Sequence, residues 1–268
     1  MIHQKKVSAE KYFRRYLRIG PLALAIWRAV EARHFASLDL KRPMLDIGCG
    51  FGEFALAFFE TPCDTGIDNN AKDLGEAFKT KKYQELTLGD AREMPYKDNT
   101  FSSIISVSTL EHIPFPKKVL KEAYRTLKSG GLLAVTLETD EVDPNTFYRP
   151  AMKKVGLGWL SDWCTYLYNT MYHRHTLLPK KQWKKMILET GFEIDLYRDV
   201  ISVKVTKLFD IFLLTAWPSQ IWKVIIGKRK VWRPQWMEDM LVKIFLPTLN
   251  EEEGYGTNLL IVARKPRR

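Results

Sequence analysis

Short strand-like runs alternate with helical repeats through the middle of the chain. Between two of these runs, Lys117 to Leu127 places apolar residues at the spacing of a core-facing helix that Pro116 can open. We expect Ser129-Gly-Gly131 to end this helix as a C-cap. Alternation of this kind predicts a parallel, doubly wound sheet. The expected strands cover residues 44–47, 63–68, 86–95 as a strand running into a turn, 101–108 and 132–137.

Two helices are predicted before the first strand. Ser8 to Ile19 has the pattern of a basic amphipathic helix, and Pro21 suits the first turn of a second helix. One interpretation is a helical cap packed over the sheet edge. The other is a cover over a ligand pocket, for which the candidate side chains are Tyr12, Tyr16, Trp27 and Arg28.

A glycine-rich turn follows the first predicted strand, in Pro43-Met-Leu-Asp-Ile-Gly-Cys-Gly-Phe-Gly-Glu-Phe54. Glycines let the backbone turn sharply and let a ligand lie against the main chain, where a helix N-terminus offers unpaired N–H groups. A dinucleotide and S-adenosylmethionine are the two candidate ligands. The spacing Gly48-x-Gly50-x-Gly52 departs from the dinucleotide fingerprint G-x-G-x-x-G. Asp46 would repel a pyrophosphate but suits a ligand that carries an ammonium and a sulfonium.

Two later acids stand at predicted strand ends, on the side where α/β sheets bind ligands. Asp68 lies about 20 residues after the turn, the separation at which such folds place a carboxylate for ribose hydroxyls. As a lone residue it could equally form a turn or cap a helix. Asp90 and the backbone of Ala91 are placed to meet a base edge. Asn69-Asn70 can cap a helix over residues 71–80.

The composition is that of a globular chain with an excess of positive charge. The 268 residues are 46% hydrophobic and 27% charged, and 42 Lys+Arg against 31 Asp+Glu give a net charge of +11. This excess favours anionic partners such as nucleic acid, lipid headgroups or acidic small molecules. Cys49, Cys63 and Cys164 form no C-x-x-C pair, which fits a reduced cytosolic setting. No uninterrupted apolar stretch follows the N-terminal lysines, so we expect no signal peptide.

Successive motifs occur in a fixed order along the chain. They are Leu45-Asp-Ile-Gly-Cys-Gly-Phe-Gly, Gly66-Ile-Asp-Asn, Gly89-Asp-Ala-Arg-Glu-Met-Pro-Tyr, Asp98-Asn-Thr-Phe-Ser, Leu110-Glu-His-Ile and Leu127-Lys-Ser-Gly-Gly. From Pro43 to about Leu137 they resemble the class I S-adenosylmethionine-dependent methyltransferases, in the methyltransferase type 11 branch with the ubiquinone and menaquinone enzymes. The resemblance implies an α/β, Rossmann-like, doubly wound seven-stranded sheet with helical insertions. That sheet is mostly parallel, and its last strand, at 257–264, is antiparallel.

The resemblance also implies which residues bind the cofactor S-adenosylmethionine, whose product is S-adenosylhomocysteine. The glycine turn and Asp46 would hold the methionine end, Asp68 the ribose, and residues after the third strand the adenine. The full candidate set is Asp46, Gly48, Cys49, Gly50, Asp68, Asn69, Asp90, Ala91 and Ser108. His112 matches a His of the family's Glu-His motif and is the candidate catalytic residue, with a structural hydrogen-bonding role as the alternative. No metal is expected, because His173-x-His175 lacks nearby Cys or acid partners.

Two insertions extend the compact pattern. An aromatic-rich insertion follows the fifth strand; it is either an acceptor lid or a helical excursion with its own core. A basic, Trp-rich insertion at about 202–249 suits a membrane-interface segment or a helical hairpin packed on the domain, and is too interrupted to span a bilayer. We therefore divide the chain into a cap at 1–40, a cofactor-binding core at 41–138, the lid insertion at 139–178 and the completion of the sheet at 179–268.

We expect direct in-line methyl transfer to a small-molecule or lipid-like acceptor, by a cytoplasmic protein that can lie on the inner face of the membrane. An anionic membrane surface is accordingly a candidate partner. A general base is needed only if the acceptor must lose a proton; His112 and His173 are the candidates. One alternative is an RNA or other nucleic-acid methyltransferase, favoured by the charge but lacking an Asn-Pro-Pro-Tyr motif near the fourth strand. The other is a non-catalytic S-adenosylmethionine-binding protein.

Overall fold

The computed structural model describes residues 6–171, 174, 177–213, 232–252 and 254–267. Seven strands in this part of the chain form one sheet, in the order β3-β2-β1-β4-β5-β7-β6. The first five pair in parallel and β7 is antiparallel to both of its neighbours, which confirms the predicted sheet. The strands are β1 (Met44–Ile47), β2 (Cys63–Asp68), β3 (Tyr83–Leu88), β4 (Phe101–Val107), β5 (Leu127–Glu138), β6 (Glu193–Ser202) and β7 (Gly256–Arg264).

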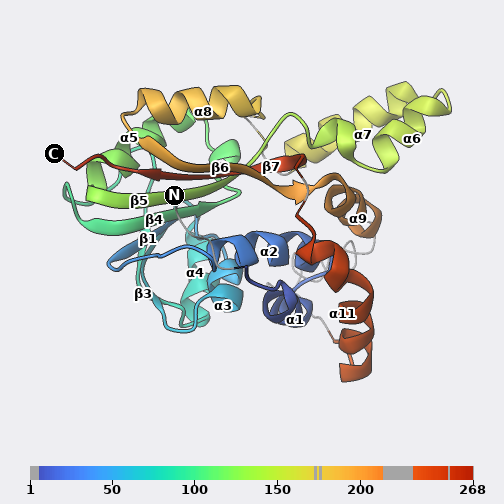
Figure 1. Cartoon of the computed structure of the whole chain (residues 1–268), viewed down its shortest axis with the longest axis horizontal. Helices are drawn as coiled ribbons and strands as arrows, with labels where there is room; N and C mark the ends of the chain where they lie inside the picture. Colours follow the sequence, from blue (N-terminus) through green and yellow to red (C-terminus); the bar gives the residue numbers. More distant parts are fainter. Residues whose placement is uncertain (1–5, 172–173, 175–176, 214–231, 253, 268) are drawn as a thin grey trace.

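Helices cover both faces of the sheet (Figure 1). On one face lie α5 (Pro116–Thr126) and α8 (Lys180–Glu189). The other face carries α1 (Glu10–Ile19), α2 (Leu22–Phe35), α3 (Glu53–Phe58) and α4 (Ala71–Lys79). The side chain of Asn70 accepts hydrogen bonds from the backbone N–H groups of Lys72 and Asp73, so it caps α4 as predicted.

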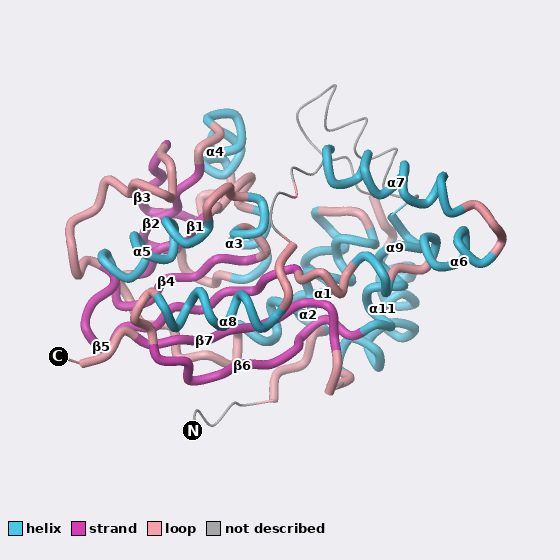
Figure 2. Tube along the Cα trace, turned by 90° about the horizontal axis from the view of Figure 1, so that it is seen from above, coloured by secondary structure: helices cyan, strands magenta, loops and turns pink. Residues whose placement is uncertain are grey.

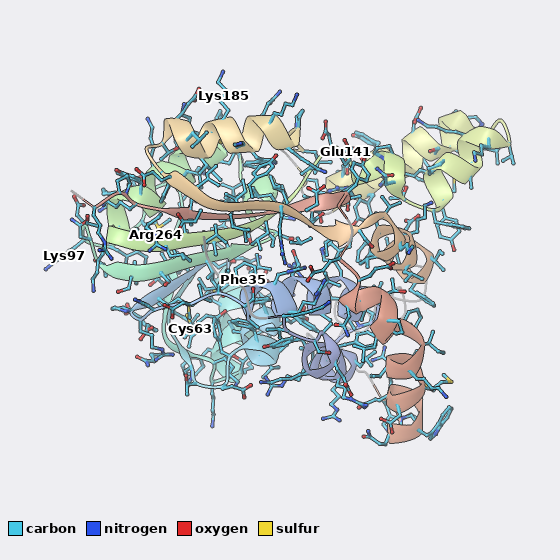
Figure 3. All side chains as sticks on the ribbon, viewed as in Figure 1. Phe35, Cys63, Lys97, Glu141, Lys185 and Arg264 are labelled. Carbon is cyan, nitrogen blue, oxygen red and sulfur yellow. The ribbon has the colours of Figure 1, made fainter. Side chains whose placement is uncertain are left out.

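The sheet separates two hydrophobic cores. Because successive residues of a strand point to opposite faces, Ile104 of β4 packs in one core and Ile105 in the other. Trp183 of α8 is fully buried in the first of these cores. Phe35 of α2, labelled in Figure 3, is fully buried in the second. A strand that is apolar on both faces is typical of a covered parallel sheet.

The second insertion packs on the N-terminal helices. It contains α9 (Val203–Leu213) and α11 (Gln235–Asn250). The ring of Trp27 in α2 lies 4.9 Å from that of Phe209, and the ring of Phe13 in α1 lies 6.3 Å from that of Phe245. The part of this insertion at 214–231 lies outside the described residues. None of the described helices is long and apolar enough to cross a membrane.

The first insertion projects from the body of the molecule as two helices (Figures 1 and 2). After the short 3-10 turn η2 (Asp143–Asn145) come α6 (Tyr148–Lys154) and α7 (Gly158–Met171). Trp159 and Trp163 of α7 are 70% and 55% exposed, so these aromatics are not part of a closed core. His173, a candidate base, lies outside the described residues. His175, which forms the His-x-His pair with it, lies outside them as well.

Two local expectations were wrong. The helix α5 ends at Thr126, and Ser129-Gly-Gly131 lies inside β5 rather than in a C-cap. Leu127 already has extended backbone and pairs with Phe101, so the chain passes directly from helix to strand. The glycines instead serve an irregular stretch in which the pairing of β5 with β4 shifts register. The third strand is Tyr83–Leu88, several residues earlier than the predicted run at 86–95.

Replacing Trp183 by alanine should lower the free energy of unfolding by about 3–5 kcal/mol, because it opens a cavity in a closed core. Trp159→Ala removes the same side chain from an exposed site and should change it by less than about 0.5 kcal/mol. Urea denaturation of both variants measures the difference. Equal losses would contradict this assignment of the core.

Candidate cofactor site

A cavity of about 480 Å³ opens where β1 and β4 end. The strand order reverses between these two neighbours, and ligands of α/β sheets bind at such a switch point. Three parts of the chain line the cavity: the glycine turn after β1, the end of β4 with the 3-10 turn η1 (Leu110–His112), and the two N-terminal helices. The volume is in the range that holds a small-molecule ligand.

The glycine turn is shaped by close contacts and by positive φ angles. Gly48 has φ +71°, and a Cβ there would lie 2.0 Å from Cγ2 of Thr109. Gly50 has φ +50°, but a Cβ there would meet nothing within 4 Å, because this part of the turn faces open space. Gly48 is therefore needed for packing, whereas Gly50 leaves bare main chain beside the cavity.

Asp46, the acid at the end of β1, is a buried member of the lining. Its side chain is 3% exposed, and the hydroxyl of Tyr83 donates a hydrogen bond of 2.6 Å to its Oδ2. Burial raises the pKa of Asp46 to about 6, although the hydrogen bond from Tyr83 acts in the opposite direction. The carboxylate is therefore ionised near neutral pH and protonated in mild acid.

A guanidinium from α2 faces the same cavity. Arg28 donates hydrogen bonds to Oε2 of Glu31 at 2.8 Å and to the carbonyl of Val107 at 3.2 Å. Burial alone would lower the pKa of Arg28, but the nearby Glu31 carboxylate raises it above its ordinary value. Glu31 is itself fully buried and accepts a 2.6 Å hydrogen bond from the hydroxyl of Ser108. This chain of contacts fixes Arg28 against the end of β4.

Tyr16 of α1 adds a polar atom to the lining. The residue is 1% exposed, and its hydroxyl has no hydrogen-bond partner among the described residues. Burial raises the pKa of Tyr16 well above its ordinary value, so the hydroxyl keeps its proton. An unpaired buried hydroxyl costs about 1–3 kcal/mol, which a ligand group could relieve.

The predicted cofactor residues fall into two groups. Six predicted site residues line this one cavity: Asp46, Gly48, Cys49, Gly50, Ser108 and His112. Asp68 adjoins it, because its Oδ2 accepts a 2.8 Å hydrogen bond from the N–H of Gly50. Its Oδ1 accepts another from the N–H of Asn70, so Asp68 also braces the turn, as the structural alternative predicted.

Besides Asp68, three predicted residues are not part of the lining. Asn69 is exposed, and Ala91 is buried in the core with Ile67. Asp90 forms a close ion pair with Arg92, whose Nη2 lies 2.7 Å from Oδ2. The side chain of Arg92 is the main reason why the pKa of Asp90 is lowered.

Of the four side chains named as candidates for a cover over the ligand pocket, two line the cavity and two do not. Tyr16 and Arg28 belong to the lining, whereas Tyr12 and Trp27 pack in the core on that face of the sheet. Leu24 of α2 and Thr109 also belong to the lining and carry no motif in the sequence. No group of metal-ligating side chains occurs within the described ranges.

A scan against known families matches a methyltransferase domain at residues 45–135. This segment contains the glycine turn, Asp46, Asp68, Asp90 and His112. Residues 45–135 of this chain are therefore similar to a methyltransferase domain. The order of the motifs in this segment resembles that of the class I, S-adenosylmethionine-dependent methyltransferases.

Curated relatives match over the same region. The chain is 33% identical over 126 residues to cycloartenol-C-24-methyltransferase 1 of Oryza sativa subsp. japonica, covering 42% of this chain and 37% of that protein. It is 34% identical over 105 residues to the demethylmenaquinone methyltransferase of Bacillus licheniformis, covering 36% and 44%. The chain thus spans less than half the length of these two relatives.

Solved structures share the fold across nearly the whole chain. A SAM-dependent methyltransferase from Thermotoga maritima superposes with a TM-score of 0.57, at 20% identity and with 91% of each chain covered. The [4+2]-cyclase SpnF superposes with a TM-score of 0.53, also at 20% identity, covering 86% of this chain and 77% of that one. One fold therefore carries proteins named for different reactions, so function has to be inferred from the site.

The raised pKa of Asp46 predicts that the affinity for S-adenosylmethionine depends on pH. A ligand whose ammonium pairs with the ionised Asp46 carboxylate should lose affinity as the pH drops through about 6. Tyr83→Phe removes a hydrogen bond that favours the ionised form, so the midpoint should move to higher pH. Calorimetric titrations across the pH range measure both. A flat wild-type profile, or a midpoint that Tyr83→Phe lowers, would overturn this role of Asp46.

The two glycines of the turn should respond differently to alanine. Gly48→Ala adds a clash with Thr109 to an unfavourable φ and should destabilise the fold by more than about 2 kcal/mol. Gly50→Ala incurs only the φ cost of about 1–2 kcal/mol, but its methyl group should weaken S-adenosylmethionine binding. Denaturation and calorimetry separate the two effects. A Gly50→Ala variant with wild-type affinity would contradict a ligand against this main chain.

Proposed function

We propose that this protein transfers a methyl group from S-adenosylmethionine to a lipid-like small molecule by direct in-line displacement. The observation that supports binding of this cofactor is that Asp46 and Arg28 line the same cavity, beside bare glycine backbone. A carboxylate and a guanidinium together complement the zwitterionic amino-acid end of this cofactor.

The lining fits that cofactor residue by residue. Asp46 would accept from its ammonium, Arg28 would hold its carboxylate, and the unpartnered hydroxyl of Tyr16 would pair with either group. When bound, S-adenosylmethionine supplies a methyl group already activated on a sulfonium. The chain's own task is then to orient the two reactants and to exclude water.

The adenosine end is assigned to residues beside the cavity. Each oxygen of Asp68 retains a lone pair after accepting one backbone hydrogen bond, so the carboxylate can still accept from ribose hydroxyls. The adenine would contact Asn69, Ala91 and Asp90. Asp90 would make this contact while it keeps its ion pair with Arg92. For an acceptor that must lose a proton, His112 in the lining is our candidate base.

Two observations favour a lipid-like acceptor at a membrane surface. The relatives described above are named for cycloartenol and demethylmenaquinone. In addition, four apolar side chains spaced by four residues are exposed along α11 and the residues just before it. They are Trp232, Trp236, Met240 and Ile244, at 81%, 64%, 44% and 57% exposure. We therefore propose that the protein works as a peripheral protein on the inner face of the membrane, with this stripe at the lipid interface and the projecting insertion as the acceptor lid.

Methyl transfer can be tested directly with radiolabelled S-adenosylmethionine and three acceptors: a prenylated naphthoquinol, a sterol and a mixed RNA. We expect label in the lipid phase with the quinol or the sterol, and about a hundredfold less with Asp46→Asn. Label confined to RNA would support the nucleic-acid alternative. Cofactor binding with no transfer to any acceptor would favour the non-catalytic alternative.

Membrane contact can be tested by sedimentation with anionic vesicles. Trp232→Ala combined with Trp236→Ala should reduce vesicle binding about tenfold or more, because indole rings favour the lipid interface. Phe78→Ala, at an aromatic residue of α4 that is 76% exposed, is the matched control and should leave binding unchanged. Equal effects of both changes would remove the support for α11 as the contact surface.

A further inference from the structure

A second cavity, of about 390 Å³, lies between the end of α2 and strand β6. It shares no lining residue with the cofactor cavity. Leu24 and Arg28 of α2 line the cofactor cavity, whereas Arg33 and His34, one to two turns further along the helix, line the second. A smaller cavity of about 150 Å³ adjoins it and shares Arg33, His34, Arg198 and Glu252.

Two guanidinium groups line this cavity. Arg33 is only 3% exposed, and one of its nitrogens donates to the carbonyl of Glu251 at 3.0 Å. Arg198 of β6 contacts Nδ1 of His34. Because Nδ1 accepts from a guanidinium, His34 is neutral, and burial lowers its pKa to about 2. The Nε–H groups of Arg33 and Arg198 have no partner among the described residues.

The acids around the cavity leave positive charge uncompensated. Asp199 is paired with Lys180 at 2.6 Å, and Glu251 with Lys204 at 2.8 Å. The remaining acid is Glu252, which is half exposed and lies 3.7 Å from Arg33. Two guanidiniums are therefore left with one half-exposed carboxylate between them.

The electrostatics of Arg33 and Arg198 also favour a bound anion. Burial lowers the pKa of Arg33, the nearby charge of Glu252 acts in the opposite direction, and the charge of Arg198 lowers the pKa again. Two guanidiniums that share one half-exposed carboxylate are incompletely neutralised, and a bound anion relieves that cost. Such an arrangement favours a ligand over a purely structural cluster.

We propose that this cavity binds the phosphate group of an organic phosphate ester, held between Arg33 and Arg198. Two guanidiniums lining one cavity provide the planar donors that suit the oxygens of a phosphate. The volume exceeds that of inorganic phosphate, and the rings of Tyr197 and Tyr255 in the lining offer an apolar wall for the rest of the ester. The ester can be a free metabolite or the headgroup of a phospholipid. This site is independent of the proposed methyl transfer.

Calorimetry on the whole protein at constant ionic strength tests the site, with inorganic phosphate and glycerol 3-phosphate as probes. We expect saturable binding, tighter for glycerol 3-phosphate, and a loss of about tenfold or more in Arg198→Gln. Arg198 is the chosen position because it is only half buried. Arg33 is almost fully buried, so the affinity of a second variant, Arg33→Gln, is interpreted only if that variant unfolds cooperatively.

Arg264→Gln is the matched control. Arg264 lies at the far end of the neighbouring strand β7, labelled in Figure 3, and its loss changes net charge equally. It should change the affinity by less than about twofold. No saturation with either probe, or equal weakening by Arg198→Gln and Arg264→Gln, would overturn the proposal. S-adenosylmethionine affinity, measured in the same samples, should be unchanged in Arg198→Gln, so failure here is distinct from failure of the cofactor site.

Vesicles of phosphatidylcholine, with and without phosphatidic acid, distinguish the two sources of the phosphate. Binding to the phosphatidic acid vesicles that Arg198→Gln abolishes would identify a headgroup site. Binding of glycerol 3-phosphate without such vesicle binding would identify a free ester.

Discussion

The cofactor site depends on a carboxylate that is fully enclosed by protein. Glu31 of α2 pairs with Arg28 and accepts a hydrogen bond from Ser108 at the end of β4, so it joins the N-terminal helices to the sheet. A buried carboxylate is tolerated only when it is paired and hydrogen-bonded, which makes the arrangement specific. The same carboxylate holds Arg28, and with it one polar part of the cavity wall, against the end of β4.

Much of the fold could be predicted because its signals are local. The first two strands, the Asn70 cap of α4 and the alternation of strands and helices follow from patterns within a few residues of one another. Ser129-Gly-Gly131 was misassigned because glycine favours both helix ends and irregular strands, and pairing of Leu127 with Phe101 decided between them. That pairing joins residues on different elements and leaves no trace in the local sequence.

In the candidate site, too, the residues that could be predicted are those with a local sequence signal. Asp46 and the glycine turn could be located because their spacing is itself the motif. Arg28 and Tyr16 could only be named as members of a cover, since their orientation depends on a contact between Glu31 and Ser108, 77 residues apart. The ion pair of Asp90 with Arg92 is local, by contrast, and the Asp-x-Arg spacing could have predicted it.

The most direct measurement is a crystal structure with S-adenosylhomocysteine bound. The account predicts its amino group within hydrogen-bond distance of Asp46, its carboxylate at Arg28 and its ribose hydroxyls at Asp68. An amino-acid end placed away from both Asp46 and Arg28, or a protein that does not bind this nucleoside, would contradict the account.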